Sequence, residues 1–284
     1  LFGPFTDRLP NFAAWYDAQK SAHDFGYPVN GFEAPYGRAQ FVFEYDTDRT
    51  PSPPATLAEL ADWIRAHPGR FTYPQPPDFT GSAFLRQVFY ATTGGHEQYL
   101  NGFNPELYAK NAPQTFTWLS DLKPYLWQEG RTYPKDAAAL DTLFARGEID
   151  MGMSYHPAHA QMKILEKTYP ETVRTFVLAE GAIFNTHFTA IPFNAPNKAG
   201  AMVLANFLMS PEAQLSKFKP ENWGDMPALE VSKLEAAERK TFAEVDLGEA
   251  TLDTDALSSA AVPEIRPEYL ELLEKDWDRI ILGH

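Results

Sequence analysis

The order in which strand-like and helical segments follow one another is what most constrains how this chain can fold. Residues 38–45 (RAQFVFEY) alternate in hydrophobicity and are rich in Val and Phe, which predicts a strand. The segment Thr56-Leu57-Ala58-Glu59 is a capping box and predicts a helix that runs to Ala66. Strands that alternate with helices favour an α/β fold with largely parallel sheets. Further strands are predicted at 70–73, 148–154, 173–178 and 187–191, and further helices from about 81, at 113–129, at 135–146, from 157, at 198–209 and at 266–282.

The charge balance excludes one class of partner. The chain has 38 Asp and Glu against 24 Lys and Arg, a formal net charge of −14. Nucleic-acid-binding proteins need clustered basic residues to displace phosphate counterions, so we expect no nucleic-acid partner. The negative charge mildly favours a cationic or zwitterionic small molecule over an anion.

Motifs that carry catalysis are sparse. The chain has no Cys, which excludes thiol catalysis, disulfides, zinc ribbons and iron–sulfur sites. It contains no P-loop, dinucleotide-binding, nucleophile-elbow or HExxH motif. No run of about 18 apolar residues occurs, so no membrane-spanning helix is predicted.

Two pairs of residues deserve a chemical interpretation. His156 and His159 are spaced i, i+3 and could aim two rings at a metal, but no third ligand is predictable nearby. One cleft His and one surface His is therefore the preferred interpretation, and we expect no metal site and no cofactor.

Glu148 and Asp150 lie on one face of a predicted strand and could serve acid/base chemistry. The simpler interpretation places Glu148 at an exposed strand edge.

Aromatic residues fall at positions where they could line a concave site. These aromatic residues lie in loops and at strand ends, not on the buried faces of helices. At such positions they can offer apolar area and ring faces for stacking. The alternative for each is an ordinary half-buried aromatic of a large protein. These residues are Trp15, Tyr36, Tyr73, Tyr155, Phe184 and Trp223.

Three stretches resemble the extracellular solute-binding proteins of ABC importers, a two-lobed (type II) family. Residues 34–64 resemble its crossover strand, acidic turn, Pro-rich segment and following helix. Residues 147–160 (GEIDMGMSYHPAHA) and 180–214 resemble its ligand loop, its return strand AIPFNAPNK and its SPEAQ helix. The strings PYGRAQFVF and LFGPF are most similar to a little-characterised, thiamine-type branch of the family.

The resemblance implies the domain organisation. The first lobe would comprise residues 1–37 plus 188–284, and the second lobe residues 38–187. Family members carry a longer segment before the first crossover, so we expect the N-terminal part of the first lobe to be missing from this chain.

The resemblance also implies the function. We expect a periplasmic, monomeric receptor that binds a small solute between two hinged lobes and delivers it to ABC permease subunits. A thiamine-like compound or another cation or zwitterion is the favoured solute, and no enzyme activity is expected. The alternative is a hydrolase on the same architecture that uses Glu148 and Asp150.

The site residues follow from where solutes bind in this architecture. Ligands of open α/β sheets lie outside the carboxyl ends of strands, which here are Tyr73–Ser82, Ser154–His156 and Gly181–Asn185. A helix opening at Thr80-Gly81-Ser82 offers free amides to a carbonyl or anionic group, although simple capping is the alternative. Arg38 could pair with a carboxylate or phosphate of the solute, or could lock to Glu33. The predicted solute-binding residues are Tyr36, Arg38, Tyr73, Thr80, Ser82, Ser154, Tyr155, His156, Phe184, Asn185 and Trp223.

Overall fold

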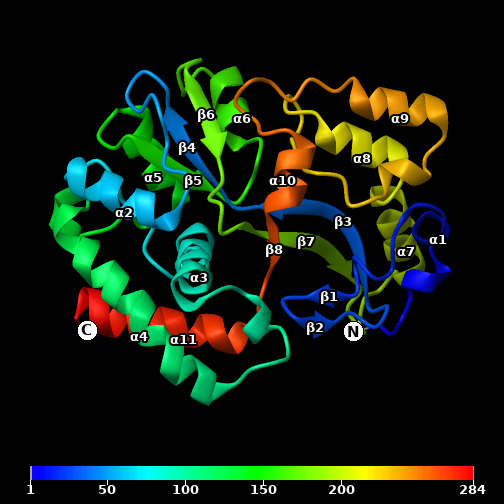
Figure 1. Ribbon diagram of the computed structural model, residues 1–284. Helices are drawn as coiled ribbons and strands as arrows, with labels where there is room; N and C mark the ends of the chain where they lie inside the picture. Colours follow the sequence, from blue (N-terminus) through cyan, green and yellow to red (C-terminus); the bar gives the residue numbers. More distant parts are fainter. Residues whose placement is uncertain (1, 284) are drawn as a thin grey trace. The chain divides into compact units, whose positions relative to one another are not determined.

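The computed structural model describes residues 2–283, and these divide into two compact units (Figure 1). Unit 1 contains the residues up to Ala39 together with Phe184–Gly248. Unit 2 contains Gln40–Ile183 together with the residues from Glu249 onward. The first two points at which the chain passes from one unit to the other lie within four residues of those expected. Residues from 249 onward, however, pack in unit 2, although all of 188–284 was expected in the first lobe.

Unit 2 is built around a three-stranded sheet with the strand order β5-β4-β6. Strand β4 is antiparallel to both neighbours, with Phe43 opposite Met153 on one side and Phe176 on the other. The expectation of parallel sheets was therefore wrong for this sheet. Strands β5 and β6 run in the same direction, joined by helix α6 as in a parallel crossover unit, but β4 inserts between them. The strands are β4 Val42–Asp46, β5 Met151–Ser154 and β6 Val173–Phe176.

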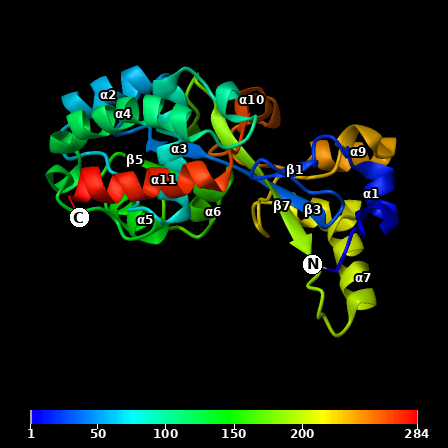
Figure 2. The ribbon, with the colours of Figure 1, turned by 90° about the horizontal axis from the view of Figure 1, so that it is seen from below.

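Helices account for most of the rest of unit 2. Helix α3 packs against α4 and α11, and Figure 2 shows these three helices next to one another. The α-helices are α2 Leu57–Ala66, α3 Phe79–Thr93, α4 Pro105–Leu122, α5 Ala137–Ala145, α6 His159–Leu165, α10 Thr254–Ala260 and α11 Pro267–Trp277. The unit also contains short 3-10 helices at Glu97–Tyr99, Lys123–Tyr125 and Trp127–Gly130, a π-helix at Asp278–Leu282 and strand β8 Ala261–Pro263.

The closing segment joins unit 2 because its largest side chains are buried there. Trp277 is fully buried, and its indole Nε1 donates a hydrogen bond of 2.9 Å to the hydroxyl of Tyr73. The hydroxyl of Tyr269, also fully buried, accepts a 2.9 Å hydrogen bond from the backbone amide of Asn104. Burial of two large aromatic side chains contributes several kcal/mol, which fixes this helix on its unit.

Local capping signals located some helix starts well and others poorly. Thr56 caps α2 by accepting a hydrogen bond of 3.1 Å from the amide of Glu59, as predicted. Asp78, not Thr80, caps α3, so this helix begins at Phe79. Helix α4 begins at Pro105, eight residues before the predicted start, and includes Pro113. Residues 70–73 do not form the predicted strand. This segment makes isolated backbone hydrogen bonds to other parts of unit 2. In one of them the amide of Asp150 donates to the carbonyl of Arg70 at 2.9 Å.

Unit 1 contains a β3–β7 strand pair and a layer of helices. Strands β3 and β7 are neighbours in one sheet. Ser210 caps α8 through the amide of Ala213, with Pro211 at the first helical position, as predicted. The elements are β1 His23–Asp24, β2 Tyr27–Pro28, β3 Glu33–Gln40, β7 Ala182–Ala190, α1 Pro10–Trp15, α7 Lys198–Leu208, α8 Pro211–Phe218 and α9 Ala236–Ala243, with 3-10 turns at Thr6–Arg8 and Val231–Lys233.

The core of unit 1 draws together residues far apart in sequence. Phe5, Ala34, Ile191, Met209 and Phe242 belong to one buried cluster. Helix α7 adds Ala205 to that cluster on one side, whereas Val203, Leu204 and Phe207 expose 71%, 58% and 51% of their surface. Within the described residues, no helix is both long enough and apolar enough to cross a bilayer.

Candidate functional site

An aromatic cluster in unit 1 joins two of the predicted site residues. Tyr36 lies on β3 and Trp223 in the loop after α8, and their ring centroids are 6.5 Å apart. His187 on β7 adds a third ring, 5.9 Å from that of Tyr36. Trp223 is 44% exposed, whereas Tyr36 and His187 are half-buried. We call these three rings the aromatic cluster.

A buried ion pair lies beneath the aromatic cluster. The ammonium of Lys217 on α8 is 3.4 Å from Oδ2 of Asp225, and it also donates a hydrogen bond to the carbonyl oxygen of Tyr36. The same ammonium lies 4.9 Å from the ring centroid of Tyr36 and 5.7 Å from that of Trp223. Asp225 is only 2% exposed, and its Oδ1 has no hydrogen-bond partner among the described residues.

The backbone of β3 approaches this ion pair closely. A Cβ added at Gly37 would lie 1.9 Å from Oδ2 of Asp225, so only glycine fits there. Arg38 and Met226 exchange backbone hydrogen bonds of 2.9 and 3.2 Å, which hold the loop of Trp223 and Asp225 against β3. Glycine and this two-residue bridge therefore set the position of the carboxylate.

Burial shifts the pKa values of Asp225, Lys217 and His187. Burial raises the pKa of Asp225 to about 6, although Lys217 opposes the shift. Burial also lowers the pKa of Lys217, against the favourable effect of Asp225. The pKa of His187 is lowered by burial and by the charge of Lys217. His187 Nδ1 lies 3.8 Å from Oδ1 of Asp225, beyond hydrogen-bond distance.

Arg38 lies on the same face of β3 as Tyr36, because side chains two positions apart on a strand point to the same side. Its guanidinium Nη2 is 3.7 Å from a carboxylate oxygen of Glu230, which in turn pairs with Lys20 at 2.7 Å. The carboxylate that pairs with Arg38 is therefore Glu230, and the Nε of Arg38 is buried without a hydrogen-bond partner within residues 2–283. Glu33 was the partner that the sequence suggested for this role.

A second aromatic surface occurs in unit 2. The ring of Tyr155, which is 7% exposed, meets the half-exposed ring of Phe79 edge to face at 4.9 Å. The hydroxyl of Tyr155 donates a hydrogen bond of 2.7 Å to Glu264. Glu264 also accepts two hydrogen bonds from the guanidinium of Arg86, at 2.8 and 2.9 Å, and Arg86 is fully buried. This bidentate pair fixes the orientation of the Tyr155 ring.

The remaining predicted site residues are divided between the units. Tyr73 is 1% exposed and bonded to Trp277, and Ser82 is 1% exposed and donates a hydrogen bond to Glu274. Thr80 and Ser154 are buried, and the hydroxyl of Ser154 accepts a bond of 3.1 Å from the amide of His156. Phe184 and Asn185 are half-buried on β7 in unit 1, while His156 is half-buried in unit 2.

Sequence reasoning missed four of the charged or titratable residues in these clusters. Lys217 sits in an ordinary amphipathic helix, and nothing local marks it as buried. Asp225 stands two positions after Trp223, which was itself a predicted site residue, so this loop held a usable signal. Arg86 and Glu264 are 178 positions apart, and their pairing is invisible to local patterns.

One group among the described residues has the composition of a metal site. Ligand atoms of Glu44, Asp141 and His159 all lie within 4.8 Å of one another. Each imidazole nitrogen of His159 already contacts a carboxylate, Nδ1 with Glu44 at 2.7 Å and Nε2 with Asp141 at 3.2 Å. A ring with both nitrogens so occupied is an imidazolium that bridges two acids. Burial disfavours that charge, but Glu44 and Asp141 outweigh it and raise the pKa of His159 to about 10.

This histidine predicts a pH effect on the stability of the protein. Because its pKa is raised in the folded state, the stabilisation is fully present below about pH 6.5 and is lost as the pH rises through about 10. We expect the free energy of unfolding to fall more steeply over this window in the unchanged protein than in His159→Gln. Urea unfolding at pH 6, 8 and 10 measures both. Parallel pH profiles for the two proteins would contradict the assignment.

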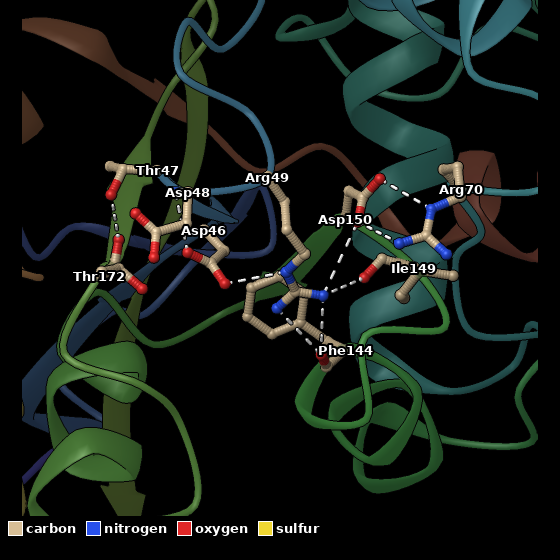
Figure 3. A network of polar contacts seen from close by, with 9 residues as sticks. All are labelled: Asp46, Thr47, Asp48, Arg49, Arg70, Phe144, Ile149, Asp150 and Thr172. Carbon is tan, nitrogen blue, oxygen red and sulfur yellow. Dashed lines mark hydrogen bonds and ion pairs between the residues drawn. The ribbon is translucent and has the colours of Figure 1, made fainter.

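The carboxylate pair that suggested a hydrolase has a structural role in part. Figure 3 shows Asp150 held by Arg70, whose Nε donates at 2.8 Å to one carboxylate oxygen, while Arg49 lies 3.7 Å from the other. Arg49 also bonds Asp46 at 2.8 Å. Glu148 is exposed, and its carbonyl accepts a hydrogen bond from Arg70. A carboxylate paired with two guanidiniums is a poor general base, so this geometry does not support the hydrolase alternative.

Comparison with known proteins identifies the family. The family model of bacterial extracellular solute-binding proteins matches residues 1–243. Protein YnjB of Escherichia coli K12 is 36% identical over 274 residues, which cover 96% of this chain and 68% of that protein. The chain belongs to the bacterial extracellular solute-binding protein family.

Solved structures agree on the fold. An ABC transporter structure from Clostridium perfringens matches with a TM-score of 0.66 at 18% identity, covering 99% of this chain and 76% of that one. A periplasmic thiamin-binding protein matches with a TM-score of 0.56 at 19% identity, covering 98% of this chain and 76% of that one. The fold is thus the two-lobed α/β fold of ABC substrate-binding proteins, as the sequence predicted, and solute binding is the function of the family.

Proposed function

We propose that this protein is the receptor of an ABC importer, that it acts as a monomer in the periplasm, and that it hands a small solute to permease subunits without altering it. Family membership over residues 1–243 carries this proposal. The aromatic cluster of unit 1 supports it, because three rings beside a buried ion pair form a surface suited to binding and have no hydrolytic geometry.

Each unit contributes one surface to solute binding in this proposal. In unit 1, Trp223 and Tyr36 offer ring faces for stacking, and Arg38 offers guanidinium donors to a polar group of the solute. In unit 2, Phe79 and Tyr155 offer ring edges and faces. The half-buried residues Phe184, Asn185 and His156 remain proposed contacts. Tyr73, Thr80, Ser82 and Ser154 are all buried in unit 2, and they are proposed to support the surface of Phe79 and Tyr155.

The solute itself remains a proposal at the level of class. The net charge of −14 and the exposed ring of Phe79 in unit 2 favour a ring-containing cation or zwitterion such as a thiamine-like compound. The fold shared with a periplasmic thiamin-binding protein is consistent with this choice.

A thermal-shift screen tests the receptor function. We expect one class among vitamins, polyamines, sugars and oxyanions to raise the melting temperature saturably, since a ligand at about 100 times its Kd adds roughly 2.7 kcal/mol to stability. Hydrolysis assays on phosphate esters and glycosides serve as the control. If no compound shifts the melting temperature while hydrolysis occurs and disappears in Asp150→Ala, the protein is an enzyme and the proposal fails.

A further inference from the structure

The ammonium of Lys217 occupies a place that resembles the binding site of an organic cation. Sites for such ligands combine a carboxylate with aromatic faces within about 6 Å of the positive charge. Here the carboxylate of Asp225 is 3.4 Å from the ammonium, and two ring centroids lie at 4.9 and 5.7 Å. The cation belongs to the protein itself.

The lysine is held there at some cost, which argues against an incidental surface contact. Its side chain is 8% exposed, and that of Asp225 is 1% exposed. A lysine that only decorated the surface would keep its ammonium in water, since the long aliphatic stem lets it do so. The backbone agrees with this arrangement, because Gly37 leaves room for the Asp225 carboxylate where any side chain would displace it.

The same surroundings are open to a solute on one side. Trp223 is 44% exposed, and the side chain of His187 is 33% exposed, so the aromatic cluster borders solvent directly above the ion pair. A positively charged group that approached these rings would meet the ammonium already present. A neutral ring would not be repelled, and an anionic group would be attracted by the ammonium and repelled only by the more deeply buried carboxylate of Asp225.

We infer that Lys217 is a specificity-determining residue, a built-in cation that fills an aromatic and carboxylate cage and thereby excludes cationic groups of a solute from this part of unit 1. The inference rests on the proposed receptor function and narrows it. The part of the solute that contacts Trp223 and Tyr36 is neutral or anionic. A solute with a positive charge keeps that charge away from Lys217.

Chemical rescue tests this inference directly. Lys217→Ala removes three methylene groups and the ammonium, which n-propylammonium can replace. We expect the variant to melt at a lower temperature than the unchanged protein. We expect n-propylammonium chloride to raise its melting temperature saturably, by about 3 °C at ten times the apparent Kd. The unchanged protein should show no such shift, because its cage is full.

Four kinds of control separate the cage from general salt and solvent effects. Potassium chloride and 1-propanol at equal concentrations should not reproduce the shift in Lys217→Ala. Lys217→Met, which keeps the volume of the side chain without its charge, should leave no cavity for the amine. Adding Asp225→Asn to Lys217→Ala should weaken the amine at least tenfold. Lys240→Ala, a change at a lysine whose side chain is 74% exposed, should create no amine site.

The inference can also be tested if Lys217→Ala folds poorly. In that case the yield of native Lys217→Ala after dilution from urea is compared with and without n-propylammonium, and a yield that ignores the amine overturns the inference. A shift that 1-propanol matches, or that survives Asp225→Asn unchanged, overturns it as well. A solute found in the thermal-shift screen without amine rescue would reject the role of Lys217 and leave the receptor function standing. Rescue by the amine, without any solute found in the screen, would support the role of Lys217 and reject the receptor function.

Discussion

Glu264→Ala is expected to lower the free energy of unfolding by about 3–5 kcal/mol, because it leaves a buried guanidinium without its counter-charge. Arg86 is fully buried, and Glu264 provides both of its side-chain ion-pair contacts within the described residues, at 2.8 and 2.9 Å. The change also removes the acceptor of the Tyr155 hydroxyl. Urea unfolding followed by circular dichroism measures the loss.

Two further variants separate the charge effect from the hydrogen bond. Tyr155→Phe removes only the hydroxyl that donates to Glu264, and should cost about 1 kcal/mol. The double variant Arg86→Met, Glu264→Leu removes both charges and should recover much of the stability lost in Glu264→Ala, because no charge is then left buried and unpaired. A Glu264→Ala protein that is no less stable than Tyr155→Phe would show that the buried pair contributes little.

Trp223→Ala is expected to weaken solute binding about 30-fold or more, because large, partly exposed aromatic residues are the side chains that most often dominate a binding surface. Trp223 is 44% exposed and stands beside Tyr36 above the Lys217–Asp225 pair. Isothermal titration calorimetry with the compound selected by the thermal-shift screen measures the change.

The controls for this prediction vary the ring and its place. Trp223→Phe keeps a stacking face and should recover most of the affinity. Trp63→Ala removes a tryptophan that stacks on His67 in unit 2 and belongs to neither aromatic surface, and should leave the affinity unchanged. Binding to Trp223→Ala within threefold of the unchanged protein would place the solute elsewhere.

Much of the local structure was predictable because its causes are local. The capping interaction of Thr56 with Glu59, and that of Ser210 before Pro211, mark helix starts within a few residues of sequence. Strand β4 was predicted from its alternation, although the structure ends the preceding strand at Gln40 and resumes at Val42. The family resemblance at 34–64 and 180–214 led to the fold and the class of protein, which the comparisons confirm.

The parts that escaped prediction depend on contacts between distant residues. Whether β5 and β6 flank β4 is decided by tertiary pairing, so the antiparallel order could not be inferred from three separate strand signals. Glu44 and His159 are 115 positions apart, so neither residue alone suggests the bridged histidine. The position of the closing helix depended on a core contact between Trp277 and Tyr73. Tyr36 and Trp223 were predicted as site residues, but the buried charges beneath them were not.

Neither unit is made from one unbroken stretch of chain, and this affects how the protein is synthesised. Asn11 and Asn206 bond to each other across 195 positions, so the early residues of unit 1 leave the ribosome long before their partners exist. Unit 2 likewise receives Trp277 long after its partner Tyr73, which lies 204 positions earlier in the chain. Apolar segments of both units therefore stay partly collapsed until their partners have been synthesised. In that state they expose apolar surface that a chaperone for nascent chains can bind.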